Sequence, residues 1–124
     1  MPANRPEQCD ALLGEAISAG DIDAAVALYE PGATFLAEPG KTVTGTDAIR
    51  KVMVDFIAMK PTLKVEVPLV VQSGDTAILY SQWTLTGTAP DGSAVNMAGK
   101  GQEVVRRQAN GDWLFIIDNP WGAP

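Results

Sequence analysis

Histidine is absent from the 124 residues of this chain, and Cys9 is its only cysteine. Without histidine, no Ser-His-Asp or Cys-His catalytic arrangement can form. The imidazole ligands of the usual zinc and non-haem iron sites are missing too, and no glycine-rich phosphate loop is present, so we expect no metal and no cofactor. A single cysteine excludes an intramolecular disulfide. Proton transfer would therefore depend on carboxylates, tyrosine, lysine or water.

Long apolar runs and basic clusters are also missing. No segment reaches the roughly 18–20 apolar residues of a membrane span. Residues 1–7 are polar with two prolines and lack the apolar stretch of a signal peptide, so we expect a cytoplasmic, reducing location. Nine Lys and Arg against 15 Asp and Glu give a net charge of −6. Neither a nucleic acid nor a membrane is an expected partner.

What is present is an ordinary globular composition, with 46% hydrophobic residues. The length fits one domain over residues 1–124. Apolar residues at helical spacing predict helices, and alternation predicts strands. The expected helices are 7–19, 22–30 and 46–59, and the expected strands are 33–37, 63–71, 76–88, 94–108 and 113–119. Gly20 is expected to end the first helix and Asp21 to cap the second.

The last four strands are separated by turn signals, namely Ser73-Gly74-Asp75, Asp91-Gly92 and Asn110-Gly111. This order of elements predicts an α+β fold, in which a curved antiparallel sheet packs on three N-terminal helices. Gly99 and Gly101 lie inside a predicted strand, where glycine often marks a bend or a bulge. A long strand bent there could fold the sheet into a cup.

Three segments carry a resemblance to a known family: residues 19–35, which form a helix-helix-strand unit; residues 44–53, which open the third helix; and residues 104–122, the final hairpin and its tail. Together they resemble the nuclear transport factor 2-like superfamily, in its SnoaL-like and ketosteroid isomerase-like branch. The resemblance implies a cone-shaped cup, or cystatin-like α+β barrel, with an apolar pocket for a small molecule. It also implies a homodimer formed through the outer face of the sheet.

The resemblance assigns expected roles to acidic residues. Glu38, before Pro39, falls within one residue of the isomerases' general base; the alternative is a solvated turn acid. Glu103 matches the position of the isomerases' protonated oxyanion-hole acid and lies on the same face of its predicted strand as Gly101. The alternative is an exposed glutamate that pairs with a lysine or arginine across the sheet. Leu13 stands where those enzymes carry an oxyanion tyrosine, so one donor is missing.

The end of the last strand supplies a further candidate. Asp118 is a candidate catalytic acid or base, and only one of Asp118 and Asn119 can point inward. The expected ligand-contacting residues share a position on a predicted wall of the cup: Trp83, Tyr29, Phe35, Phe56, Met97 and Asn119. Tyr29 and Phe56 have the alternative of packing in the core, and so does Trp83.

Two functional hypotheses remain open from the sequence. One is a cofactor-free isomerase, cyclase or dehydratase that uses carboxylate acid-base chemistry on a small apolar carbonyl compound. The other is a non-catalytic ligand-binding or dimeric assembly domain of the same fold. A structural subunit of a larger oxygenase ranks behind both. Fold alone does not choose among them.

Overall fold

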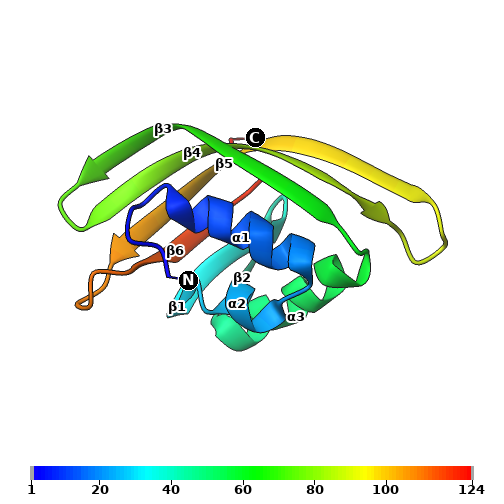
Figure 1. Cartoon of the computed structure of the whole chain (residues 1–124), viewed down its shortest axis with the longest axis horizontal. Coiled ribbons are helices and arrows are strands. Elements are labelled where there is room, and N and C mark those ends of the chain that lie inside the picture. Colours follow the sequence, from blue (N-terminus) through cyan, green and yellow to red (C-terminus); the bar gives the residue numbers. More distant parts are fainter. Residues whose placement is uncertain (1, 124) are drawn as a thin grey trace.

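The computed structural model describes residues 2–123. It contains three helices on one face of a single curved sheet (Figure 1). The helices are α1 (Gln8–Ala19), α2 (Ile22–Val26) and α3 (Thr46–Ala58). The strands are β1 (Tyr29–Glu38), β2 (Lys41–Thr44), β3 (Thr62–Ser73), β4 (Thr76–Thr88), β5 (Ala94–Arg107) and β6 (Trp113–Asn119). The predicted α+β architecture is confirmed.

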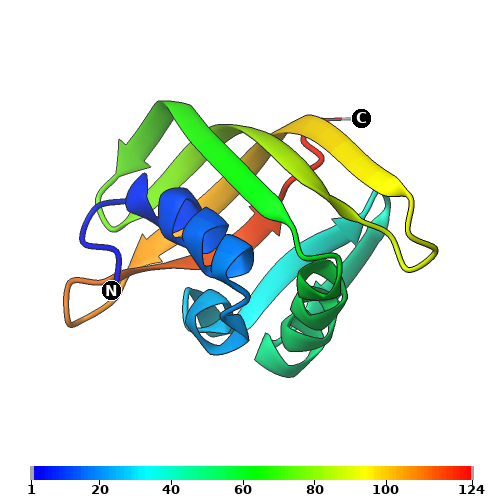
Figure 2. The ribbon, with the colours of Figure 1, turned by 45° about the vertical axis from the view of Figure 1, so that its right-hand side comes forward.

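The sheet has the strand order β2-β1-β6-β5-β4-β3. Strands β3, β4 and β5 are long, and they arch over α1 (Figures 1 and 2). All neighbouring strands pair antiparallel except β1 and β6, which run parallel. The side chains on the concave face of the sheet point toward the helices, and the core fills the space between the sheet and the helices.

The junction between α1 and α2 follows the sequence prediction. Gly20 adopts a left-handed φ of 72°, and the backbone N–H of Asp21 donates to the carbonyl of Ala16 at 2.9 Å. Glycine reaches this conformation without the steric cost that other residues meet. The Asp21 carboxylate accepts from the backbone N–H of Ala24 at 3.0 Å, so Asp21 caps α2 as expected.

The second helix and the strands after it differ from the prediction. The predicted helix over 22–30 ends at Val26, and the first strand begins at Tyr29, where the prediction placed it at residue 33. Tyr29 lies opposite Phe115 in the parallel β1–β6 pair. The predicted order also missed β2, which pairs with β1 across Pro39-Gly40. Both errors concern strand pairing, which the local pattern of apolar residues does not encode.

The core lies between the concave face of the sheet and the three helices. Its most deeply buried side chains include Phe115, Leu79 and Val105 from the sheet and Ile49 and Met53 from α3. No helix within residues 2–123 has the length and apolar character needed to cross a membrane.

Candidate functional site

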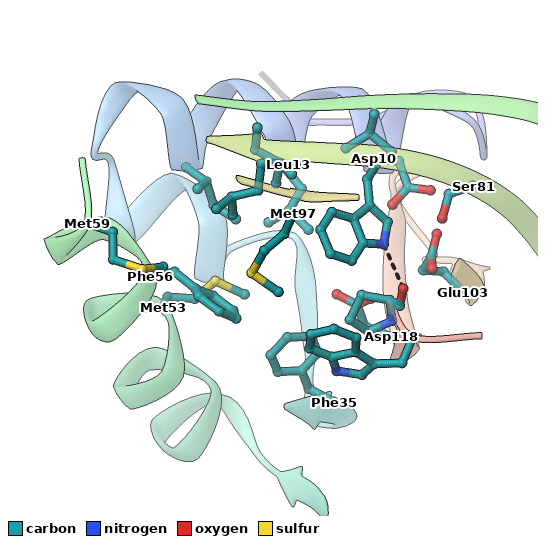
Figure 3. Close-up of a pocket in the computed structure, with 17 residues that line it drawn as sticks. Asp10, Leu13, Phe35, Met53, Phe56, Met59, Ser81, Met97, Glu103 and Asp118 are labelled. Atoms are coloured by element: carbon teal, nitrogen blue, oxygen red, sulfur yellow. Dashed lines mark hydrogen bonds between the residues drawn. The ribbon is translucent and has the colours of Figure 1, made fainter. Parts of the chain in front are cut away.

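An internal pocket lies between the concave face of the sheet and helices α1 and α3 (Figure 3). Its volume is about 90 Å³, well above the roughly 10–15 Å³ that one water molecule needs. The lining residues come from every layer of the fold: Asp10, Leu13, Ile17, Phe35, Met53, Phe56, Met59, Leu63, Val65, Ser81, Trp83, Leu85, Met97, Glu103, Asp118, Pro120 and Trp121.

The pocket has two chemically different ends. Met53, Phe56 and Met59 gather at one end, where α3 closes the pocket (Figure 3). Asp10, Ser81, Glu103 and Asp118 gather at the other end, so polar groups are confined to one side. A bound molecule therefore meets an apolar wall along most of its length and a group of carboxyls at one end. We call Asp10, Glu103 and Asp118 the carboxyl cluster of the pocket.

Glu103 lies in β5, directly opposite Leu79 of β4 and Asp118 of β6. Only 2% of the residue is exposed, and neither carboxyl oxygen has a hydrogen-bond partner of ordinary geometry among the described residues. Burial, followed by the neighbouring Asp10 and Asp118 carboxyls, raises the pKa of Glu103 from 4.5 to about 11; the nearby Ser81 hydroxyl acts in the opposite direction. Glu103 is therefore neutral at pH 7 and can donate a hydrogen bond.

Asp10 lies on α1 beside Glu103 and is 3% exposed. Burial raises its pKa, while the neighbouring Glu103 carboxyl acts in the opposite direction. The sequence prediction missed this residue. A signal was available, because Asp10 shares the buried face of α1 with Leu13 and Ile17 at helical spacing. An acid on an apolar stripe is unusual unless it is paired.

Asp118 lies at the end of β6 and points inward, whereas Ile117 points outward and is 47% exposed. The Tyr29 hydroxyl donates a hydrogen bond of 2.5 Å to Asp118 Oδ2. The pKa of Asp118 is raised from 3.8 to about 7: burial raises it most, the hydrogen bond from Tyr29 lowers it, and the neighbouring Asp10 carboxyl raises it. Tyr29 is fully buried, and its own pKa is raised well above 10. Asp118 is thus a base poised near neutral pH.

Two tryptophans close the pocket beside the C-terminal tail. The Trp83 indole N–H donates to the carbonyl of Pro120 at 2.6 Å, and the Trp83 and Trp121 rings meet edge to face at 5.8 Å between centroids. Asn119 is half-buried and does not line the pocket. Its side chain accepts from the backbone N–H groups of Trp121 and Gly122 and so folds the tail over the pocket.

Gly99 and Gly101 make room for pocket side chains. The register of β4 and β5 continues without interruption across both residues, so the bulge that the sequence suggested is not present there. A Cβ at position 99 would lie 2.7 Å from the Trp83 ring, and one at position 101 would meet the Glu103 carboxyl and the Ser81 hydroxyl. The glycines therefore permit close packing around the site.

The structure brings together most of the predicted site residues. Phe35, Phe56, Met97 and Trp83 line the pocket with Glu103 and Asp118. Tyr29 reaches the site through the Asp118 carboxyl rather than by contact with the cavity. Glu38 does not join them: it lies exposed at the end of β1, opposite Lys41. The bulge between Leu36 and Glu38 belongs to the β1–β2 hairpin, which the sequence prediction lacked.

No group of three His, Cys, Asp or Glu side chains within residues 2–123 has a geometry that could hold a metal ion. The described pocket instead combines one neutral acid, Glu103, with one base, Asp118, that titrates near neutrality. Two titratable groups whose environments separate their pKa values can act as an acid and a base in the same reaction.

Comparison with known proteins identifies the fold and one family. The model of the SnoaL-like domain family matches residues 11–116. No curated protein matches the chain. Solved structures that resemble it include a nuclear transport factor 2-like superfamily protein from Salmonella enterica serovar Typhimurium, with 19% identity, a TM-score of 0.82, and coverage of 95% of this chain and 88% of that one.

Two further structures show the same architecture. A ketosteroid isomerase-like protein from Erwinia carotovora atroseptica has 24% identity and a TM-score of 0.78, covering 90% of this chain and 88% of that one. A protein with a cystatin-like fold from Novosphingobium aromaticivorans has 17% identity and a TM-score of 0.76, covering 90% of this chain and 75% of that one. At these identities the likeness extends to the fold alone.

Proposed function

This chain is a member of the SnoaL-like domain family, and we propose that it is a cofactor-independent acid-base enzyme for a small apolar carbonyl compound, of the isomerase, cyclase or dehydratase type. The observation that supports this proposal most strongly is the pairing of a neutral Glu103 with a base, Asp118, in one apolar pocket. The name of the Erwinia structure, ketosteroid isomerase-like, is consistent with chemistry of this kind.

The proposed roles follow from the protonation states. Asp118, held by Tyr29, removes a proton from the carbon next to the carbonyl group. Glu103 donates a hydrogen bond or a proton to the carbonyl oxygen. The apolar walls, including Trp83 and Phe35, hold the body of the substrate and exclude water. The small volume of the pocket favours a compact molecule.

The test is α-proton exchange in deuterium oxide, followed by proton NMR on a panel of small cyclic and aromatic ketones. The proposal predicts exchange above the buffer rate, a loss of about a hundredfold or more in Asp118→Asn, and a smaller loss in Glu103→Gln, which keeps a donor. Glu15→Gln is the matched control, because Glu15 is exposed on α1. Full exchange in Asp118→Asn would contradict the proposal.

A non-catalytic ligand-binding domain is the alternative. It is favoured by Leu13, which lines the pocket where the resembling isomerases carry an oxyanion tyrosine. The same panel separates the two functions, because this alternative predicts ketone binding without any exchange that depends on Asp118.

The proposal includes a homodimer formed through the outer face of the sheet. Val71, Ile78, Val104 and Ile117 lie opposite one another across four neighbouring strands and form one apolar row on that face. Val71 and Ile117 are 48% and 47% exposed, and exposed apolar rows of this kind are typical of interfaces. Sedimentation should show a dimer that Ile117→Lys converts to a monomer; a monomeric wild type would contradict it.

The proposed location is the cytoplasm. The one thiol in the chain, Cys9, is buried and unpaired, which suits a reducing compartment.

A further inference from the structure

The indole N–H of Trp121 is a buried hydrogen-bond donor without a partner. The buried, unpaired side-chain atoms in residues 2–123 are this nitrogen, Asp10 Oδ2 and the two carboxyl oxygens of Glu103, and all belong to residues that line the pocket. Buried polar groups are nearly always paired, so an unpaired donor beside a cavity indicates where an acceptor of a ligand binds. The acid-base chemistry proposed above uses Glu103 and leaves Trp121 without a role.

The C-terminal tail holds Trp121 in one position before any ligand binds. Its backbone N–H donates to Asn119 Oδ1 at 3.2 Å. The carbonyl of Pro120, the preceding residue, accepts from the Trp83 indole N–H at 2.6 Å, and the rings of Trp83 and Trp121 meet edge to face. Trp83 thus spends its own donor on fixing the tail, whereas the donor of Trp121 stays available. A group that is fixed before binding loses little conformational entropy when the ligand arrives.

The other donors of the pocket are either paired or gathered at its polar end. Outside the carboxyl cluster, the lining side chains that carry a donor are Ser81, Trp83 and Trp121. The donor of Trp83 is paired, and the Ser81 hydroxyl lies beside the Glu103 carboxyl (Figure 3). A ligand therefore meets two donor positions, one formed by neutral Glu103 with Ser81 and the other formed by Trp121.

These two donor positions lie against different rows of the sheet. Glu103 pairs with Leu79 of β4, whereas Trp121 packs against Trp83, four residues further along the same strand. At about 3.3 Å per residue, Leu79 and Trp83 are roughly 13 Å apart along β4. The side chains reach into the pocket and shorten this gap, but a single ligand oxygen is not expected to accept from both donors. The arrangement suits two oxygens at opposite ends of one compact molecule.

We propose that the substrate carries two oxygen acceptors: a carbonyl oxygen that accepts from Glu103 and a second oxygen that accepts from the indole N–H of Trp121. This inference rests on the proposed function and specifies the substrate class, namely compact carbonyl compounds with a second carbonyl or ether oxygen at the far end. Trp121 is then a specificity-determining residue, because a substrate without the second oxygen leaves its N–H unpaired. Sites built to pair with a polar group of the substrate reject analogues that lack it.

The first test observes the indole N–H groups directly by proton–nitrogen correlation NMR. The chain has three tryptophans, so three indole signals are expected, and Trp121→Phe identifies one of them by its loss. Trp113, which does not line the pocket, is the internal control. Titration with cyclohexane-1,4-dione should move the Trp121 signal downfield. Its analogue 4-methylidenecyclohexanone, which carries a CH2 group in place of the second carbonyl oxygen, should not.

A longer pair of probes covers a wider spacing of the two oxygens. In 1,4-diacetylbenzene the carbonyl groups stand on opposite sides of an aromatic ring, and 4-isopropenylacetophenone again replaces one oxygen by CH2. The inference predicts that the two-oxygen member of at least one pair moves the Trp121 signal downfield relative to its analogue, while the Trp113 signal stays in place. The absence of such a difference in both pairs would overturn it.

The second test compares dissociation constants in wild type and Trp121→Phe. The variant removes the N–H group and keeps an aromatic ring, so both members of a pair lose similar packing contacts. The preference for the two-oxygen probe over its analogue should fall by about fivefold to tenfold in Trp121→Phe. Glu15→Gln, an exposed change on α1, should keep the preference. An equal preference in wild type and Trp121→Phe would overturn the inference, and the wild-type NMR titration does not depend on the folding of this variant.

The two proposals fail in different ways. Exchange that depends on Asp118, without a response of Trp121 to either pair, would leave the proposed function standing and refute the second oxygen. A response of Trp121 to a two-oxygen probe, without exchange of any ketone, would support Trp121 as a donor to the ligand and refute the proposed function.

Discussion

Replacement of Glu103 by glutamine should stabilise the protein at neutral pH. Burial raises the pKa of Glu103 from 4.5 to about 11. The raised value contributes stability that is complete below pH 4.5 and is lost as the pH rises toward 11, because the unfolded chain ionises while the folded chain does not. The free energy of unfolding therefore falls by about 1.4 kcal/mol for each pH unit above 4.5, and the loss reaches about 3 kcal/mol at pH 7. Glutamine is neutral at every pH and avoids it.

The assay is urea unfolding of the wild type and Glu103→Gln at pH 4.5 and pH 7. With the usual urea dependence of about 1–3 kcal/mol per molar, the midpoint of the variant should exceed that of the wild type by about 1–3 M more at pH 7 than at pH 4.5. Glu15→Gln should show no such change with pH. A difference between wild type and Glu103→Gln that does not depend on pH would refute a buried neutral Glu103.

Three further substitutions test other parts of the structure. Tyr29→Phe removes the hydrogen bond that lowers the pKa of Asp118, so the pH–rate profile of exchange should move to higher pH; an unmoved profile would contradict the role of Tyr29. Gly101→Ala places a Cβ against the Glu103 carboxyl and the Ser81 hydroxyl and should lower the midpoint of urea unfolding; an unchanged midpoint would refute the packing argument. Phe115→Ala empties a fully buried core position and should cost about 3–5 kcal/mol in urea unfolding; a cost below about 1 kcal/mol would contradict its place in the core.

The sequence predicted the elements whose signals are local. Helix α1 and helix α3 show apolar stripes, and strands β3 to β6 are bounded by glycine turns, so their ranges differ from the prediction by one or two residues at most ends. The start of β1 could not be predicted in the same way. Tyr29 becomes a strand residue because it pairs with Phe115, which lies far along the chain. Such pairing depends on tertiary contacts.

The site was predicted in part for the same reason. The alternation along β5 predicted that Glu103 lies on the same face of the strand as Gly101. In the structure the Glu103 side chain lines the pocket. The sequence left open which of Asp118 and Asn119 points inward, because β6 meets β5 with a register shift next to Val104. Asp10 was overlooked, although its position beside Leu13 and Ile17 on α1 distinguishes it from a surface acid.

Glu38 shows where a resemblance between families reaches its limit. Its position before Pro39 suggested a base at the pocket, but the residue lies exposed at the end of β1. The hairpin to β2 turns the chain away at this point. The base that we propose, Asp118, lies on a different strand and lines the pocket, whereas Glu38 is not among the lining residues.

The most direct test of this account is an NMR titration of the carboxyl carbons of Glu103 and Asp118 in selectively labelled protein. The account predicts that Asp118 titrates near pH 7 and that Glu103 remains protonated through neutral pH. Titration of both residues near pH 4 would show ordinary solvated carboxylates, and would contradict a pocket that holds a neutral acid beside a base.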